Sequence, residues 1–193
     1  MKLDSLCVFC GSADGLAPKY LDAASRMGTS LAHAGITLVF GAGKTGMMGA
    51  IAQSALNAGG KVIGVVPRSL NTPVLIHSGL TRLVVTSGMH SRKQRMIRMS
   101  DGFIALPGGY GTVDEWFEVL TLAQIGVMQK PVGLLNVDGF FNPLLAWIDL
   151  AIAEKFIYPE HRDLFISRDS PEELIEAMRI FSLPSNLARW VNR

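Results

Sequence analysis

The chain has 193 residues, of which 49% are hydrophobic and 18% are charged. This length predicts one compact domain over residues 1–193, and the apolar share excludes intrinsic disorder. A net charge of +2 is far from the basic excess that sequence-independent nucleic-acid binding requires, so no nucleic-acid partner is expected.

Short β-branched segments alternate with longer amphipathic ones, which is typical of βαβ units around a parallel sheet. Strands are expected over Ser5–Cys10, Thr37–Phe40, Lys61–Val66, Arg82–Thr86, Phe103–Leu106 and Val132–Leu135. Helices are expected over Lys19–Ala34, Met47–Ala58, Ser91–Ser100, Val113–Ile125, Leu144–Glu154 and Pro171–Phe181. Several strands are continuous apolar runs, as strands covered on both faces are. The sequence therefore predicts a single doubly wound, Rossmann-like α/β sheet with helices on both faces.

The cysteines and the chain start bear on location. Cys7 and Cys10 form a C-x-x-C pair, which could be a redox pair or half of a zinc site. A strand sends residues three apart to opposite faces, so we favour two buried thiols in a reducing compartment. The chain start lacks signal-peptide features, and no window approaches a membrane span of about 18 apolar residues. A cytoplasmic protein without membrane contact is expected.

Trp116 and Trp147 are expected in the core or an interface.

Three turns that follow expected strands are rich in glycine. They are Gly11-Ser12, Gly41-Ala42-Gly43-Lys44-Thr45-Gly46 and Pro107-Gly108-Gly109-Tyr110-Gly111-Thr112. Glycine lets backbone N–H groups approach an anion closely, and the helix N-terminus that follows adds its positive dipole end. Because the carboxyl ends of parallel strands share one edge, these turns together predict a phosphate site. The segment Arg68–Leu80 lacks a clear period and is a candidate functional loop over that edge.

Two familiar nucleotide-binding motifs are disfavoured at the second turn. The strand that follows it ends in Pro67-Arg68, without an acidic residue for a ribose hydroxyl, so a dinucleotide dehydrogenase is disfavoured. A P-loop requires a glycine five positions before Gly43, where Leu38 stands.

Glu115 has two interpretations. Thr112-Val113-Asp114-Glu115 fits the T-x-x-E capping box, in which the glutamate only satisfies a helix N-terminus. Alternatively, Glu115 is a carboxylate one turn inward from a bound phosphate. A carboxylate repels a phosphate, so that position is useful mainly if positive charge develops in the reaction, as in an oxocarbenium ion at a ribose carbon.

Positive charge near the predicted site comes from the helix that starts near residue 90. On a helical wheel Arg92 shares the apolar stripe of Met96 and Met99, so it either reaches the site, snorkels, or pairs with an acid. Arg95 and Arg98 are expected on a solvated flank.

The four histidines do not suggest a metal site. His33 and His161 are expected at the surface. His77 and His90 flank the predicted site but lack metal-ligand spacing.

Several motifs together resemble the LOG (Lonely Guy) family of nucleoside 5′-monophosphate phosphoribohydrolases, long labelled lysine decarboxylases. They are Cys10-Gly11-Ser12, Leu38-Val39-Phe40-Gly41-Ala42-Gly43 with Gly46-Met47-Met48-Gly49, Met89-His90-Ser91-Arg92-Lys93, Pro107-Gly108-Gly109-Tyr110-Gly111-Thr112 with Glu115, and Lys130-Pro131-Val132-Gly133-Leu134-Leu135-Asn136-Val137. The similarity runs from about residue 6 to residue 165.

The resemblance implies cleavage of the N-glycosidic bond of AMP or a cytokinin riboside 5′-monophosphate by a homodimer that uses no cofactor and no metal. It implies Arg92 and Glu115 as the catalytic pair. Implied substrate contacts, including those expected from the glycine turns, are Gly41, Gly43, Lys93, Gly108, Gly109, Tyr110, Gly111, Thr112, Val113, Asp114 and Thr121. The alternative is a non-catalytic nucleotide or phospho-ligand carrier of related fold. Val74 stands where the family commonly has a nucleotide-contacting glutamate, so weakened affinity is expected.

Overall fold

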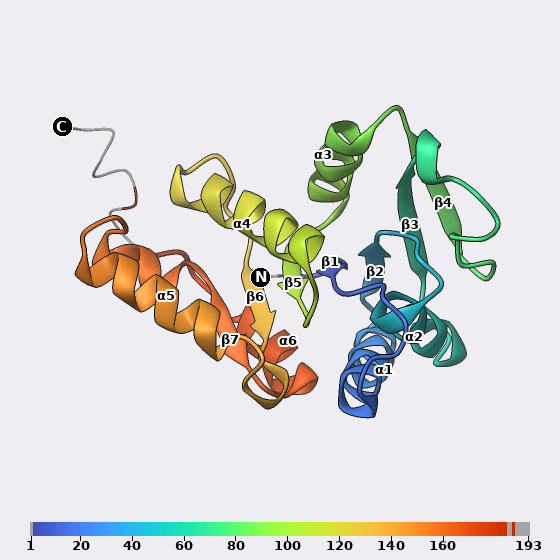
Figure 1. Cartoon of the computed structure of the whole chain (residues 1–193), viewed down its shortest axis with the longest axis horizontal. Coiled ribbons are helices and arrows are strands. Elements are labelled where there is room, and N and C mark those ends of the chain that lie inside the picture. Colours follow the sequence, from blue (N-terminus) through green and yellow to red (C-terminus); the bar gives the residue numbers. More distant parts are fainter. Residues whose placement is uncertain (1, 185–186, 188–193) are drawn as a thin grey trace.

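A computed structural model describes residues 2–184 and 187 and shows a seven-stranded sheet between two layers of helices (Figure 1). The strands are β1 (Ser5–Phe9), β2 (Thr37–Phe40), β3 (Val62–Pro67), β4 (Arg82–Thr86), β5 (Gly102–Ala105), β6 (Val132–Leu135) and β7 (Ile166–Arg168). Their order is β4-β3-β2-β1-β5-β6-β7, and every neighbouring pair is parallel. This confirms the predicted doubly wound α/β sheet.

Helices cover both faces of the sheet. They are α1 (Pro18–His33), α2 (Gly46–Asn57), α3 (Met89–Met99), α4 (Tyr110–Gln124), α5 (Asn142–Ala153) and α6 (Pro171–Arg179), with short 3₁₀ turns at Arg68–Leu70, Val137–Gly139 and Pro159–Leu164. Buried side chains of α1, α2 and α6 form one apolar cluster, and those of α3, α4 and α5 form the other. Over the described part of the chain, no helix is long and apolar enough to cross a membrane.

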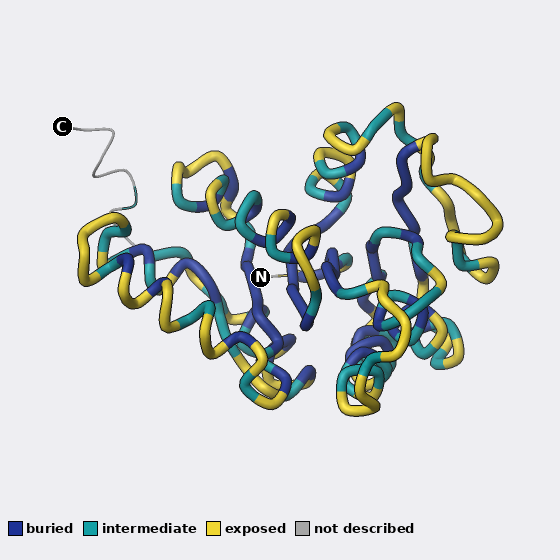
Figure 2. The backbone as a smooth tube through the Cα atoms, viewed as in Figure 1, coloured by how far each residue is buried: buried dark blue, intermediate teal, exposed yellow. Residues whose placement is uncertain are grey.

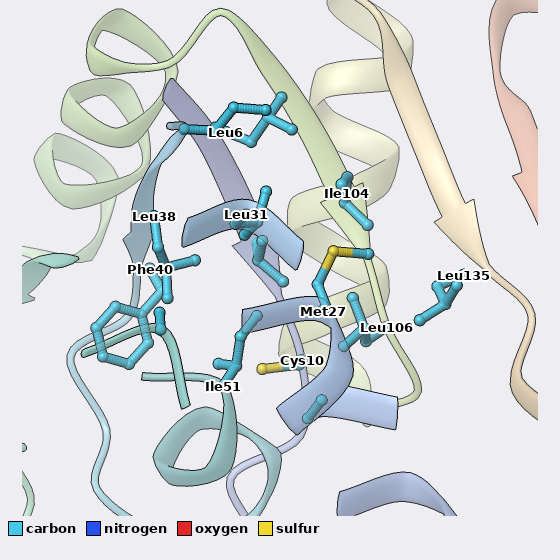
Figure 3. Packing of buried hydrophobic residues seen from close by; sticks show 14 of the residues in the cluster. Leu6, Cys10, Met27, Leu31, Leu38, Phe40, Ile51, Ile104, Leu106 and Leu135 are labelled. Carbon is cyan, nitrogen blue, oxygen red and sulfur yellow. The ribbon is translucent and has the colours of Figure 1, made fainter. Parts of the chain in front are cut away.

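The two clusters divide the core by sheet face. On the α1 side, Leu6, Leu38 and Ile104 of the strands pack with Met27 and Ile51 of the helices (Figure 3). Burial is concentrated on β1, β2, β3, β5 and β6 and on the inner sides of the helices, whereas the edge strands β4 and β7 have no buried residue (Figure 2). Apolar strand runs are therefore covered from both sides, as their composition predicts.

The buried residues confirm some expectations and correct one. Cys7 and Cys10 are free, buried thiols that belong to different clusters, as strand alternation predicts. Trp116 is buried and donates from Nε1 to the Gly133 carbonyl at 3.2 Å. His161 was expected at the surface but is buried, because the turn at 159–164 folds under α4 and α5.

The direction of chain progression reverses beside β1, and this creates the crevice at which the site lies. From β1 the chain moves outward through β2, β3 and β4, and it then returns to β5 on the other side of β1. Ligands of open α/β sheets bind at the carboxyl ends of strands at such a switch point. The Gly11 N–H donates to the Pro107 carbonyl at 3.0 Å and joins the loops that follow β1 and β5.

Candidate active site

A cavity of about 600 Å³ opens at this switch point. The cavity is lined by residues that follow five of the strands. They are Gly11 and Ser12 after β1, Gly41 and Gly43 after β2, Leu70, Leu75 and Ile76 after β3, Gly108, Gly109, Gly111 and Thr112 after β5, and Phe140 after β6. The three glycine-rich turns therefore meet at one site, as the sequence predicts. A pocket with apolar walls and a few polar groups at one end is typical of a small-ligand site.

The turn between β5 and α4 provides an anion cradle. Helix α4 has Gly109 as its N-cap residue, so the first N–H groups of the helix have no partner within it. Gly108 is packed so tightly that a Cβ at this position would lie 2.2 Å from Thr112 Oγ1. The Thr112 side chain is buried against the cavity wall. Backbone N–H groups and one hydroxyl thus converge where an anion binds favourably.

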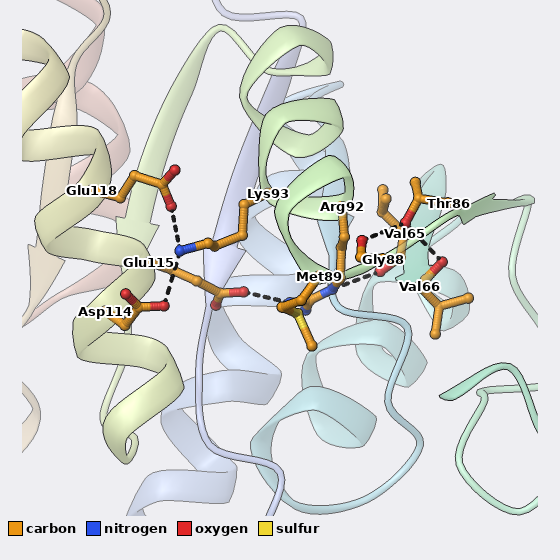
Figure 4. Close-up of polar contacts among 10 residues, drawn as sticks. All are labelled: Val65, Val66, Thr86, Gly88, Met89, Arg92, Lys93, Asp114, Glu115 and Glu118. Carbon is orange, nitrogen blue, oxygen red and sulfur yellow. Dashed lines mark hydrogen bonds and ion pairs between the residues drawn. The ribbon is translucent and has the colours of Figure 1, made fainter. Parts of the chain in front are cut away.

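Arg92 and Glu115 form a buried ion pair beside this cradle (Figure 4). Arg92 Nη1 lies 2.6 Å from Glu115 Oε1, and the two residues are 8% and 7% exposed. Arg92 also donates from Nε to the Val65 carbonyl at 3.0 Å. A Cβ at Gly41 would lie 2.4 Å from Arg92 Nη2, so any side chain at this position would displace the guanidinium. Of the alternatives predicted for Arg92, the structure shows that this arginine of the apolar stripe pairs with an acid.

Burial and pairing act in opposite directions on Glu115. Desolvation raises the pKa of the Glu115 carboxyl, while the Arg92 guanidinium lowers it, and the net pKa lies above the ordinary value. A carboxylate with a raised pKa binds a proton more readily than an exposed carboxylate does. Such perturbed groups in a cleft are typical of functional sites.

The capping-box interpretation of Glu115 is wrong. The helix begins at Tyr110, with Gly109 rather than Thr112 as the N-cap residue. Glu115 therefore lies in the second turn, and its side chain bonds to Arg92 instead of to a helix N-terminal N–H.

Five residues named as substrate contacts do not line the cavity. Lys93 Nζ binds Glu118 Oε2 at 2.7 Å and Asp114 Oδ2 at 3.1 Å in a groove between α3 and α4, and these acids raise the pKa of Lys93. Asp114 and Thr121 also line this groove, and Thr121 donates from Oγ1 to the Phe117 carbonyl at 2.7 Å. The other two are Tyr110, which is 98% exposed, and Val113. By contrast, Gly41, Gly43, Gly108, Gly109, Gly111 and Thr112 do line the cavity.

The segment after β3 forms one wall of the cavity. The Lys44 N–H donates to the Leu75 carbonyl at 3.0 Å, and the His77 N–H donates to the Ala42 carbonyl at 2.9 Å. These bonds hold the segment against the second glycine turn. Val74 is 72% exposed and does not line the cavity, so a direct ligand contact at this position is absent from this loop arrangement.

Sequence reasoning did not identify the apolar part of the lining. It includes Leu16, Tyr20, Met47, Met48, Val66, Pro67, Leu70, Leu75, Ile76, Met89 and Phe140. The aperiodic segment 68–80 was the available signal for part of this wall. Among the residues that the structure describes, no three His, Cys, Asp or Glu side chains are grouped so that they could hold a metal ion.

The fold and the site define a doubly wound α/β protein with an anion cradle beside a buried guanidinium–carboxylate pair. Residues 48–178 match the sequence model of a family described as "Possible lysine decarboxylase". A probable cytokinin riboside 5′-monophosphate phosphoribohydrolase of Oryza sativa subsp. japonica is 47% identical over 92% of this chain and 72% of its own. A cytokinin riboside 5′-monophosphate phosphoribohydrolase of Arabidopsis thaliana is 46% identical over 92% of this chain and 83% of its own. The chain belongs to the LOG family.

Solved structures share the fold. The molybdenum cofactor binding protein of Rippkaea orientalis has a TM-score of 0.69 and 26% identity over 93% of this chain and 97% of its own. The molybdenum cofactor carrier protein of Chlamydomonas reinhardtii has a TM-score of 0.70 over 92% and 97%, and at 24% identity it shows the fold alone.

Proposed function

We propose that this protein hydrolyses the N-glycosidic bond of a nucleoside 5′-monophosphate, AMP or a cytokinin riboside 5′-monophosphate, to the free base and ribose 5-phosphate. The observation that carries the proposal is the buried pair of Arg92 and Glu115, 2.6 Å apart, beside the anion cradle of the β5–α4 turn. The names of relatives that are 46–47% identical support the reaction class.

The cavity suggests an order for the parts of the substrate. The 5′-phosphate binds the N–H groups at the start of α4 and the Thr112 hydroxyl. The ribose then lies beside Glu115, and the base lies against the apolar wall of Leu70, Leu75 and Ile76. This order places the bond to be broken at the ion pair.

Each member of the pair has a role in bond cleavage. Positive charge develops on the ribose as the base departs, and the Glu115 carboxylate stabilises this charge or orients the attacking water. Arg92 neutralises the carboxylate in the resting site, holds the substrate, and assists the departing base. The apolar walls lower the local dielectric constant, which strengthens both interactions.

Assembly, location and the remaining contacts are part of the same proposal. Large apolar side chains are exposed on α5, after it, and at the end of α4, which supports a homodimer: Ile125, Val127, Trp147, Leu150 and Phe156. Buried free Cys7 and Cys10 fit a cytoplasmic location. The proposed reaction uses no cofactor and no metal. Lys93, Asp114 and Thr121 lie in the groove outside the cavity and do not contact the substrate in this proposal.

Product analysis tests the proposal. Incubation of the pure protein with AMP should release adenine and ribose 5-phosphate in equal amounts, measured by chromatography. AMP that binds without being cleaved would favour the second candidate, a phospho-ligand carrier, which the likeness to the molybdenum cofactor binding protein supports. Lysine with pyridoxal phosphate should give no cadaverine, because decarboxylation would require a Schiff-base site that the proposed mechanism does not contain.

A further inference from the structure

We propose that Met89 is an oxidisable positioning residue, and that a peroxide inactivates the enzyme by converting the Met89 thioether to a sulfoxide. The proposal rests on the proposed function, because it acts through Arg92.

The first argument is the contact between the two side chains (Figure 4). Arg92 Nη1 donates to Met89 Sδ at 3.3 Å, and the same nitrogen donates to Glu115 Oε1 at 2.6 Å. A thioether is a weak acceptor, so the carboxylate bond dominates. Met89 therefore supports the guanidinium from one side without pulling it away from Glu115.

The second argument is the position of Met89 at the start of α3. The Gly88 N–H donates to Ser91 Oγ at 3.0 Å, and Ser91 Oγ donates back to the Gly88 carbonyl at 2.9 Å. Because these bonds fix the turn, the Met89 backbone cannot easily move away from Arg92.

The third argument is accessibility. Met89 is 47% exposed and lines the cavity. The other methionines that the structure describes are buried or half-buried: Met27, Met47, Met48, Met96, Met99, Met128 and Met178. Because oxidation follows exposure, a peroxide should react with Met89 first.

The chemistry balances with a peroxide as the only co-reactant. The O–O bond of the peroxide breaks, one oxygen forms the S–O bond, and the other leaves as water or an alcohol; the sulfur is oxidised by two electrons. The sulfoxide oxygen is a much stronger acceptor than the thioether sulfur. Through the N–H that now meets the sulfur, it draws the guanidinium towards residue 89 and away from its position at Glu115, and it places a polar group on the apolar wall. Methionine sulfoxide reductases with a thiol reductant reverse the change.

Cys10 is the competing target of the peroxide, because it also lines the cavity. It is buried, and burial and the Glu115 carboxylate raise the pKa of its thiol, so the reactive thiolate is scarce. A reversibly oxidised thiol is restored by dithiothreitol alone, whereas methionine sulfoxide requires the reductases. The two targets are therefore distinguishable.

The test compares wild type, Met89→Leu and Met99→Leu. Met99 is a half-buried methionine of the same helix that lies outside the cavity lining, so Met99→Leu is the matched control. Each protein is treated with hydrogen peroxide, quenched with catalase, mapped by peptide mass spectrometry, and assayed for adenine release from AMP.

Wild type and Met99→Leu should lose about tenfold in turnover as Met89 is oxidised. The reductases should restore this activity, and dithiothreitol alone should not. Met89→Leu should start about threefold slower, because it lacks the sulfur acceptor, and should keep its remaining turnover after peroxide.

Full turnover with Met89 oxidised, or equal peroxide sensitivity in Met89→Leu, would overturn the proposal. Oxidation of Met48 or Met99 ahead of Met89 would also overturn it, and this readout needs no substrate. Untreated wild type that releases no adenine would reject the proposed function instead. The decision on Met89 would then rest on the mapping and on whether oxidation lowers the affinity for AMP.

Discussion

Arg92 and Glu115 occupy surroundings that would penalise either charge alone. Removing one member of a buried ion pair costs more than the pair contributes, because an uncompensated charge remains. Mutual neutralisation therefore allows both groups to be kept at the wall of an apolar cavity. Substrate that enters this cavity meets a carboxylate and a guanidinium that are already oriented.

Glu115→Gln separates a chemical role from a structural one. Glutamine keeps the size and an acceptor for Arg92 but removes the negative charge, so turnover of AMP should fall by about 100-fold or more in protein that remains folded. The melting temperature should fall as well, because the buried Arg92 guanidinium loses its counter-charge. Steady-state kinetics and calorimetry measure both. Glu118→Gln, one turn further along α4, is the control and should stay within about threefold of wild type. Equal turnover in Glu115→Gln and wild type would remove Glu115 from the mechanism.

The raised pKa of Glu115 determines the acid limb of the pH profile. Protonation removes the charge that stabilises an oxocarbenium ion, so turnover should fall as the pH decreases through the pKa of this carboxyl. Because burial raises that pKa, the midpoint should lie above the ordinary value of 4.5. The pH dependence of kcat/KM for AMP is the quantity to measure, since it reports the free enzyme, to which this pKa applies. A midpoint at or below 4.5 would show that Glu115 does not control the step.

Some of this site could be predicted from local sequence and some could not. Arg92 stood out because a charge on the stripe of Met96 requires a partner. Its partner lies 23 residues away on another helix, and only the crossover from α3 to α4 brings them together. At Glu115 the local T-x-x-E pattern offered a competing explanation, and nothing local indicated that the helix begins at Tyr110.

At the scale of elements, predictability followed apolar pattern and length. The six expected strands and six expected helices are present, with ends within three residues of those predicted, because buried strands and amphipathic helices have distinct periods. Strand β7 was missed because it has three residues, two of them the polar Ser167 and Arg168. The course of the segment after β3 depends on non-local bonds to Ala42 and Lys44, which leave no period in the sequence.

The contact between α1 and α6 gives a prediction at this scale. Glu172 accepts hydrogen bonds from Ser30 Oγ at 2.7 Å and Arg26 Nη2 at 2.9 Å, and the Ser30 bond in particular lowers the pKa of Glu172 to about 2. Its charged form stabilises the fold above the unfolded pKa of about 4.5, and this contribution is lost as the pH falls towards 2.

Glu172→Gln should therefore lower the free energy of unfolding at pH 7 by about 0.5–1 kcal/mol, as for an exposed pair. The difference from wild type should shrink below pH 4.5 and vanish near pH 2, as measured by urea unfolding at each pH. Glu176→Gln is the control, because Glu176 is an exposed glutamate of the same helix whose ion pair with Arg179 is long, at 3.8 Å. This variant should differ little from wild type in its free energy of unfolding. A Glu172→Gln deficit that stays constant with pH would contradict this account.

At the scale of the whole molecule, one group of exposed apolar side chains lies on α5 and beside it, where Figure 2 shows exposed residues along this helix. If this group forms the dimer interface, Leu150→Glu should weaken dimerisation at least about tenfold, or about 1.4 kcal/mol, in sedimentation experiments. Ile180→Glu, at an exposed apolar position after α6, is the matched control and should remain dimeric. Equal dissociation constants for both variants would place the interface elsewhere.

The central claim is that the anion cradle and the ion pair act on one substrate, and a comparison of AMP with adenosine tests it most directly. Adenosine has the same glycosidic bond but lacks the phosphate that binds at the start of α4. The account predicts a kcat/KM for adenosine at least about 100-fold below that for AMP, a loss of about 2.7 kcal/mol of transition-state binding. Equal values of kcat/KM for the two substrates would contradict it.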